Sequence, residues 1–395
     1  MTKPLFSVVI PAYNQAEYLG EAIDSALAQT CRHREIIVVD DGSTDATPDV
    51  TARFGSCVRY VHQLNQGIAA ARNTGIRHAK GAYVALLDAD DEWQPVFLAT
   101  MRRAIAHHPG VNAFYCAAQC MDADGHALPQ RAGAHVVPSE RLYHAILRAN
   151  FLIPSTMVIR RSTIVEAGYF DEDPCLRGCE DADLWLRLAQ QHTFIGIGDC
   201  LVRYRLHDTS MSTDVVAMQR AALAVVEKHF GPDDGQPATW PPDKRRAYGG
   251  LYRYNALTSL LRVGDWSACA EQFRRALAAD ATLAEDRTFF FELALGDQPL
   301  GRRGTRQGLD TRVSAEHIET LLATVFAPPL PDALSHVRSA AHGTAYAALA
   351  QASGLAGESA RRRDYLLRAA HYRPRSVLGP PWWRGMLRSF APKRG

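Results

Sequence analysis

The sequence has no long hydrophobic run and little cysteine. Nowhere in its 395 residues do 18 apolar residues follow one another, which argues against a membrane-spanning helix. The segment from Met1 to Pro11 has no apolar stretch long enough for a signal peptide. Eight cysteines are too few for a disulfide framework in a chain of this length. We therefore expect a folded cytoplasmic protein whose cysteines stay reduced.

Net charge is also nearly absent, at +2, but the basic residues are unevenly placed. Residues 361–395 hold ten Lys and Arg and one acid, which leaves 34 basic and 41 acidic residues in positions 1–360. Basic segments attract anionic surfaces, and tryptophans such as Trp382 and Trp383 favour the membrane–water interface. The tail therefore predicts peripheral contact with the inner membrane face. We expect no nucleic-acid partner. The alternative is that both tryptophans pack on the helical part of the chain.

Short apolar runs alternate with helical patterns in the first part of the chain. Four runs are mostly β-branched or aromatic, as buried parallel strands are. These runs are Phe6–Ile10, Ile36–Val39, Val58–His62 and Tyr83–Leu87. Apolar residues recur at helical spacing in Leu19–Leu27, Ile68–His78 and Val96–His107. Strands that alternate with helices predict a Rossmann-like α/β sheet of parallel strands.

A polar cluster follows each of these predicted strands. The clusters are Pro11–Asn14, Asp40–Ser43, Asn65–Gly67 and Asp88–Asp91. In open α/β sheets, ligands bind outside the carboxyl ends of the strands. We therefore expect the functional site at the sheet edge where these four loops meet.

The pattern changes after Asp122 and again after Gly231. The middle part predicts helices at Ser139–Arg148 and Asp181–Gln191, and strands at Thr156–Ile159 and Thr193–Ile197. After a proline-rich break, the sequence is almost entirely helical, with helix pairs at Leu251–Val263 and Trp266–Ala279, and at Gly343–Ser353 and Ser359–His371. We expect a catalytic domain of residues 1–230 and a smaller all-α accessory domain of residues 231–395.

Two acids directly after an apolar strand, Asp88 and Asp90, predict a metal site. Carboxylate oxygens suit hard divalent cations such as Mn²⁺ or Mg²⁺, and nucleotide phosphates complete the ligand shell. A solvated loop is the alternative for so short a motif. Its position after a buried strand, on the same edge as Asp40 and Asp41, favours a metal-bound diphosphate.

The other loops predict a nucleotide site. The carboxylate of Asp41 can accept the imide N–H of uracil or thymine, and Tyr13 offers a ring for stacking. A helix cap at Ser43 is the alternative, although a cap does not require two adjacent acids. Gly67 permits close approach of the backbone, and Arg72 can meet a phosphate, with an ordinary salt bridge as the alternative.

Together these motifs resemble the inverting glycosyltransferase family 2, whose members have the GT-A fold. The resemblance covers about residues 5–215 and is carried by Val8–Asn14, Val38–Asp45, Asn65–Gly75 and Leu87–Asp91. The processive subgroup has a Gln-x-x-Arg-Trp motif and membrane spans that are absent here, so the resemblance is to the non-processive bacterial type. It implies one sugar transferred per encounter from a nucleotide sugar, with nucleotide-binding residues Pro11, Ala12, Tyr13, Asp41, Gly67, Arg72 and Asp88.

The resemblance also implies catalytic residues later in the chain. Cys179–Leu188 matches the family's acid pair before a helix, in which Asp181 is the general base and Glu180 accompanies it. Tyr204–His207 matches a segment whose histidine approaches the metal, with a surface histidine as the alternative. The implied metal ligands are Asp90, Asp88 and His207. The implied partners are a UDP or dTDP sugar donor and a glycan or lipid-linked acceptor in polysaccharide biosynthesis.

Other functions fit the sequence less well. A nucleotidyltransferase needs a glycine-rich basic loop after the first strand, and Pro11–Asn14 is not such a loop. A dinucleotide-dependent oxidoreductase needs Gly-x-Gly-x-x-Gly after Ile10, which is missing. A catalytically inactive glycan-binding, nucleotide-binding or scaffold protein of the same fold remains as the alternative. We expect such a protein to have lost an acid, yet all are present: Asp41, Asp88, Asp90, Glu180 and Asp181.

Overall fold

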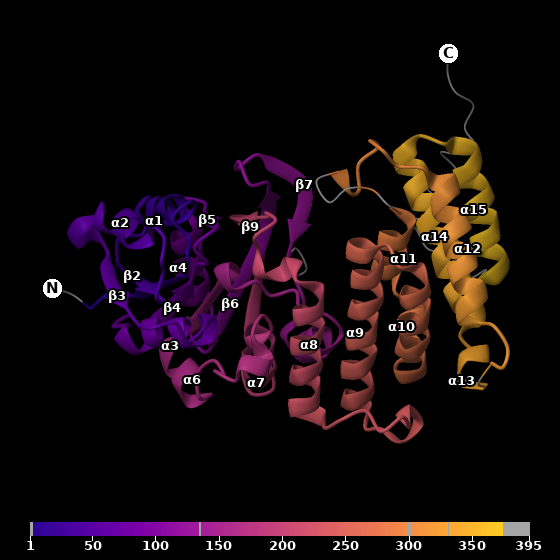
Figure 1. Cartoon of the computed structure of the whole chain (residues 1–395), viewed down its shortest axis with the longest axis horizontal. Coiled ribbons are helices and arrows are strands. Elements are labelled where there is room, and N and C mark those ends of the chain that lie inside the picture. The colour runs from indigo at the N-terminus through magenta and orange to yellow at the C-terminus, as the bar shows by residue number, and fades with distance from the viewer. Residues whose placement is uncertain (1–2, 134–135, 297, 299–301, 331, 374–395) are drawn as a thin grey trace, which may run out of the picture. The chain divides into compact units, whose positions relative to one another are not determined.

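The computed structural model describes residues 3–133, 136–296, 298, 302–330 and 332–373 (Figure 1). The chain divides into two compact units, Met1–His229 and Phe230–Gly395. No helix in the described part of the chain combines the length and apolar character that crossing a bilayer requires. The predicted membrane contact of Trp382 and Trp383 lies outside the described residues.

One mixed sheet organises the first unit. Its strands run in the order β3-β2-β1-β4-β8-β6-β9-β5, and β7 pairs with β6. The bounds are β1 (Phe6–Ala12), β2 (Arg34–Asp40), β3 (Arg59–His62), β4 (Tyr83–Leu86), β5 (Glu92–Trp93), β6 (Ala113–Met121), β7 (Ala127–Ala132), β8 (Met157–Arg160) and β9 (Phe194–Arg205).

The sheet as a whole is mixed, and the four strands that were expected to be parallel are parallel. Strands β1 to β4 are mutually parallel, but β8 is antiparallel to both β4 and β6. The reason is the place where the chain enters β8. Ser155, just before β8, accepts a hydrogen bond from the backbone N–H of Asp88 at the carboxyl end of β4. The chain therefore starts β8 at that edge and runs back across the sheet.

Two predicted strands differ in burial or length. The sequence predicts Val58–His62 as a buried strand, whereas β3 is an edge strand whose side chains are mostly exposed, because only β2 flanks it. The last strand continues past Ile197 to Arg205. This extension pairs with β5, which directly follows the Asp88–Asp91 loop. Strand β9 thereby brings its end to the acid motif.

Helices cover both faces of the sheet (Figure 1). Helices α1 (Leu19–Leu27), α2 (Thr47–Ala52) and α4 (Phe97–His107) share one hydrophobic core with inward side chains of β1 and β2. Helix α3 (Ile68–His78) packs on the opposite face, so closely that a Cβ atom at Gly75 would lie 2.3 Å from Val9 Cγ1. The remaining helices are α5 (Ser139–Arg148), α6 (Arg161–Glu166), α7 (Glu180–Ala189) and α8 (Val215–Phe230).

The second unit is helical, as predicted. Its helices are α9 (Pro242–Thr258), α10 (Trp266–Ala279), α11 (Arg287–Ala294), α12 (Thr311–Val325), α13 (Asp332–Ser335), α14 (Arg338–Ala356) and α15 (Ser359–Tyr372). Helix α9 begins earlier than the predicted Leu251, at Pro242, because the fixed φ of proline suits the first turn of a helix. Phe273 stacks on Phe289 in the core between α10 and α11.

Candidate active site

A buried arginine joins two acid motifs that are distant in the sequence. Arg72, which is 2% exposed, donates from Nη2 to Asp88 Oδ1 at 2.7 Å and from Nη1 to Glu180 Oε1 at 2.6 Å. Its guanidinium also lies 5.4 Å from the ring centre of Phe170. Arg72 was predicted to contact a phosphate, but both of its terminal nitrogens bind carboxylates instead. The loop after β4 and the start of α7 are held together as a result.

The histidine after β9 lies against the acid motif. His207 Nε2 is 3.0 Å from Asp90 Oδ2, and its Nδ1 is 2.8 Å from Thr209 Oγ1. The side chain is only 4% exposed, and its ring centre lies 4.9 Å from that of Tyr18. His207 is thus an enclosed residue with two fixed polar neighbours rather than a surface histidine.

The loop after β4 concentrates negative charge. Burial raises the pKa of Asp88 and of Asp91, and the carboxylate of Asp90 raises both further. Asp91 Oδ2 is buried and makes no hydrogen bond within the described part of the chain. A group of oxygen and imidazole donors of this kind fits a hard or borderline divalent cation.

A second group of ligand-type side chains lies in the turn between β6 and β7. Asp122, Asp124 and His126 are the three whose ligand atoms all lie within 4.8 Å of one another among the described residues. They are largely exposed. Asp88, Asp90 and His207 are less compact than this trio, and one oxygen of Asp88 is turned to Arg72.

The loops after β1, β2 and β3 are cross-linked by side chains. Asp41 is 3% exposed and accepts hydrogen bonds from the backbone N–H groups of Gln66 and Gly67, at 3.0 and 2.8 Å. Gly67 has a φ of +94°, in the region that favours glycine. Asn14 Oδ1 accepts from the backbone N–H of Thr44 at 2.8 Å. Asp41 therefore shapes the loop that precedes α3.

The remaining predicted nucleotide residues lie at the end of β1. Pro11 and Ala12 are buried within the strand and pair with Val39 and Asp40 of β2. Tyr13 follows them and is 41% exposed, so its ring is free to meet a ligand.

Asp181 lies in the first turn of α7 with both oxygens oriented by hydrogen bonds. Asn150 Nδ2 donates to Oδ2 at 3.0 Å, and the backbone N–H of Ala182 donates to Oδ1 at 2.7 Å. Burial and the neighbouring Glu180 raise the pKa of Asp181 to about 7. A carboxyl group with a pKa close to the working pH is suited to general acid–base chemistry.

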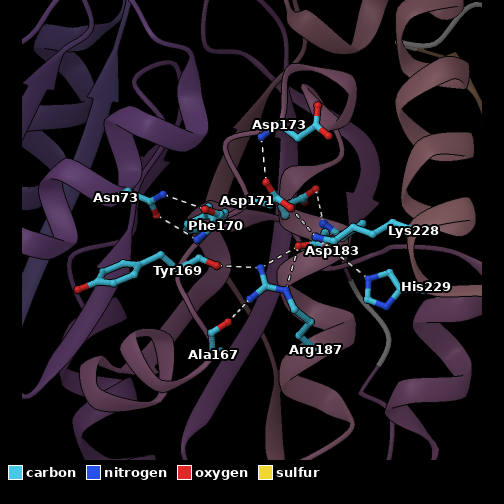
Figure 2. Close-up of polar contacts among 12 residues, drawn as sticks. Asn73, Ala167, Tyr169, Phe170, Asp171, Asp173, Asp183, Arg187, Lys228 and His229 are labelled. Carbon is cyan, nitrogen blue, oxygen red and sulfur yellow. Dashed lines mark hydrogen bonds and ion pairs between the residues drawn. The ribbon is translucent and has the colours of Figure 1, made fainter.

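Asp183, two residues further on, has a different environment (Figure 2). Its fully buried carboxylate accepts from Arg187 Nη2 at 2.7 Å, Lys228 Nζ at 2.6 Å and His229 Nε2 at 2.9 Å. Burial opposes its ionisation, but the hydrogen bonds from His229 and Lys228 and the charge of Arg187 hold its pKa below the usual range. Asp183 therefore ties α7 to α8 as an ionised carboxylate.

A cavity of about 540 Å³ lies beside the Asp183 cluster. Helices α3, α7 and α8 and the segment after α6 contribute its walls. Its lining residues are Asn73, Arg77, Ala167, Gly168, Tyr169, Phe170, Asp171, Glu172, Arg187 and Lys228. None of the predicted site residues lines it.

Two residues that no motif singled out contact the site. Asn150 holds Asp181, and Ser155 Oγ accepts from the backbone N–H of Asp88 at 3.0 Å. The sequence signal for them is weak. It consists of polar residues that flank the apolar run Phe151–Pro154 just before a predicted strand.

Comparisons with known proteins identify the family. The sequence model of glycosyl transferase family 2 matches residues 7–168. The chain is 32% identical over 217 residues to a Bacillus subtilis protein named as a teichuronic acid biosynthesis glycosyltransferase, TuaG, covering 54% of this chain and 83% of that protein. The chain belongs to glycosyltransferase family 2. Its first unit, with the mixed sheet described above, is the GT-A domain, and a helical region follows it.

Two further relatives are matched over a smaller share of their own length. An uncharacterized glycosyltransferase of Rickettsia typhi is 32% identical over 219 residues, which is 52% of this chain and 65% of that protein's length. The chondroitin synthase of Escherichia coli is 27% identical over 58% of this chain and 32% of its own length. Among solved structures, the mannosyltransferase PcManGT from Pyrobaculum calidifontis has a TM-score of 0.47 at 20% identity, covering 90% of this chain and 88% of that one.

Proposed function

We propose that this glycosyltransferase transfers one sugar from a nucleoside-diphosphate sugar, with UDP or dTDP as the favoured nucleotide, to an acceptor hydroxyl with inversion. The observation that carries the proposal is the double ion pair of Arg72 to Asp88 and Glu180. It keeps the acid loop after β4 next to the helix that carries Asp181. We assign catalysis to residues 1–230 and an accessory role to residues 231–395.

Asp181 is the general base in this proposal. The acceptor oxygen attacks the anomeric carbon from the face opposite the diphosphate, and Asp181 takes the hydroxyl proton as the new bond forms. The bond from the anomeric carbon to the diphosphate breaks, and the electron pair leaves with the diphosphate. A single displacement inverts the anomeric centre without a nucleophilic carboxylate. A positioned base typically contributes 10²–10⁴-fold to the rate.

The nucleotide occupies the loops at the carboxyl ends of β1 to β4. Tyr13 stacks on the base. Asp41 already accepts from Gln63 Nε2 and from the backbone N–H groups of Gln66 and Gly67, and it keeps one lone pair, on Oδ2, for the imide N–H of uracil or thymine. Pro11, Ala12 and Gly67 offer their backbone to the nucleotide. We revise the role of Arg72 from a direct phosphate contact to a bridge that holds Asp88 in place. Asp88 then faces either the metal or the ribose.

Asp90 and His207, with Asp88 as a further ligand, hold Mn²⁺ or Mg²⁺ in this proposal. When bound, such a cation neutralises negative charge on the departing diphosphate. The 3.0 Å separation of His207 Nε2 and Asp90 Oδ2 supports this assignment, because both atoms are donors of a type that these cations accept.

The acceptor that we propose is a glycan or a lipid-linked glycan at the inner face of the membrane, in polysaccharide biosynthesis. The name of the Bacillus subtilis relative, which refers to teichuronic acid biosynthesis, supports a role in polysaccharide biosynthesis. The basic tail with Trp382 and Trp383 would hold this cytoplasmic enzyme near such an acceptor. Flotation with anionic and neutral liposomes tests this, comparing the full chain with one that ends at Leu378. Equal flotation of both chains would refute the tail contact.

A thermal-shift panel of nucleoside diphosphates, with and without Mn²⁺, tests the donor proposal. We expect UDP or dTDP to raise the melting temperature in the presence of Mn²⁺, because a ligand that binds only the folded state stabilises it. The matched nucleotide sugar should do the same. An equal response to all nucleotides, independent of metal, would contradict the proposed donor site.

A further inference from the structure

The segment between α5 and β8 contacts both acid motifs. Ser155 Oγ accepts a hydrogen bond from the backbone N–H of Asp88, and Asn150 Nδ2 donates to Asp181 Oδ2, both at 3.0 Å. One short stretch of chain therefore reaches the loop after β4 at one end and the first turn of α7 at the other. It is a second connection between these motifs, independent of Arg72.

The amide of Asn150 is itself fixed relative to α7. Its Oδ1 accepts from the backbone N–H of Leu152 at 3.2 Å. The carbonyl of Leu152 in turn accepts from Trp185 Nε1 at 3.2 Å, and Trp185 is a fully buried side chain of α7. The donor that meets Asp181 is thus anchored to the same helix that carries Asp181.

These contacts restrict the carboxylate of Asp181. Each of its oxygens accepts one hydrogen bond, Oδ1 from the backbone of Ala182 and Oδ2 from Asn150. A carboxylate oxygen has two lone pairs, so each oxygen keeps one for another donor. We propose that Asn150 is a positioning residue that orients Asp181 to remove the proton from the acceptor hydroxyl. This inference rests on the proposed role of Asp181 as the base.

The charges around Asp181 predict how the pKa of Asp181 would change if Asn150 were removed. Glu180 on the same helix disfavours ionisation of Asp181, whereas Arg72 on α3 favours it. The thiol of Cys179, just before α7, also interacts electrostatically with Asp181. The amide of Asn150 stabilises the ionised carboxylate, so its removal should raise the pKa of Asp181 above its present value.

The test uses the full chain as wild type, Asn150→Ala, Asn150→Asp and Asp181→Asn. Gln190→Ala is the control, because Gln190 is an exposed amide at the end of α7 that bonds to Tyr143 instead. Titration by ¹³C NMR with labelled aspartate follows the Asp181 carboxyl, identified by its absence in Asp181→Asn. Turnover is measured as UDP release from a panel of UDP sugars, with water as the acceptor, across the same pH range.

We expect Asn150→Ala to raise the pKa of Asp181 and to lower kcat about tenfold, the scale of a hydrogen bond to a charged group. The KM for the donor should stay unchanged, and Asn150→Asp should raise the pKa further by adding a like charge. Gln190→Ala should match wild type. Because Asn150 is exposed, neither of its two variants is expected to unfold the chain.

Different outcomes overturn different claims. If Asp181→Asn loses turnover while Asn150→Ala keeps the wild-type kcat and titration, Asn150 is not a positioning residue and Asp181 remains the base. A lower melting temperature with an unmoved titration would also refute the inference, because it marks a purely structural role. If Asp181→Asn keeps wild-type turnover, the proposed base is wrong, and the inference falls with it.

Discussion

Arg72 and Glu180 form an ion pair in which Nη1 lies 2.6 Å from Oε1, and both side chains are almost completely buried. Glu180 immediately precedes Asp181 at the start of α7. The second carboxylate partner of Arg72, Asp88, belongs to the loop after β4. The position of the proposed base therefore depends on a side chain of α3 that does not itself accept a proton.

Replacing Arg72 by methionine should destabilise the fold by about 3–5 kcal/mol, the usual cost of leaving a buried carboxylate without its partner. Turnover should fall as well, because Asp88 and Glu180 would repel each other. Urea denaturation and UDP release measure the two effects. The matched control is Arg77→Met, on the same helix, whose ion pair with Glu172 is exposed. Equal effects at the two positions would contradict a special role for Arg72.

Asp90→Ala should abolish transfer and weaken Mn²⁺-dependent binding of UDP, since the cation loses an anchoring oxygen. Isothermal calorimetry with UDP, in the presence and absence of Mn²⁺, measures this. Asp124→Ala is the control, because Asp124 belongs to the exposed trio in the turn between β6 and β7. Loss of metal-dependent binding in Asp124→Ala, with full binding in Asp90→Ala, would move the metal site to that turn.

Asp181→Asn should leave UDP affinity intact while turnover falls by at least about 10², the scale for losing a positioned base. The base acts on the acceptor and does not touch the nucleotide. Asp173→Asn, in the segment before α7, is the control, because Asp173 only caps its own turn. Retained turnover in Asp181→Asn would require a different base.

Turnover should fall as the pH drops below about 7. Burial and Glu180 raise the pKa of Asp181 to about 7, and a protonated carboxyl group cannot accept the acceptor's proton. Below that value, kcat should decrease about tenfold per pH unit, because the ionised fraction does so. A pH profile of kcat with saturating donor measures the acid limb. A limb near the ordinary aspartate pKa of about 4 would contradict this expectation.

Asp183→Asn should destabilise the first unit without removing the proposed base. The variant leaves Arg187, Lys228 and His229 facing a neutral group, and breaking a buried ion pair costs about 3–5 kcal/mol. Because the pKa of Asp183 is lowered in the fold, its stabilisation is present above about pH 4 and is lost as the pH falls toward the folded value. Urea denaturation of wild type and Asp183→Asn at neutral pH and near pH 3 measures this. If the wild type is more stable than the variant by the same amount at both pH values, the prediction is contradicted.

Local sequence patterns predicted the strands and helices whose own residues show a clear apolar run or helical spacing. Strand β1 and helix α3 lie where β-branched runs and helical spacing placed them. Strand β6 was not predicted, because its sequence, AFYCAAQCM, is rich in alanine and poor in β-branched residues. Its place in the sheet comes from its pairing with β8 and β9, which no local pattern encodes.

The candidate site was predictable as a set of motifs but not as a set of contacts. Acids after strands indicate where charge is needed, so Asp88 and Asp90 could be singled out from the sequence, and the family resemblance singled out Asp181. The contact between Arg72 and Glu180 could not be predicted, because it depends on how α7 returns to the sheet from more than a hundred residues away. Asn150 was missed for the same reason, because only the fold places its amide next to Asp181.

Gly75 lies one turn after Arg72 on α3, where a single added carbon would collide with Val9 of β1. A larger residue there would lift the helix away from the sheet and draw Arg72 back from Asp88, which stays with β4. The depth at which α3 sits on the sheet thus sets how closely the charges of the active site are balanced. Transfer could be tuned through this packing depth alone, with every polar side chain of the site left unchanged.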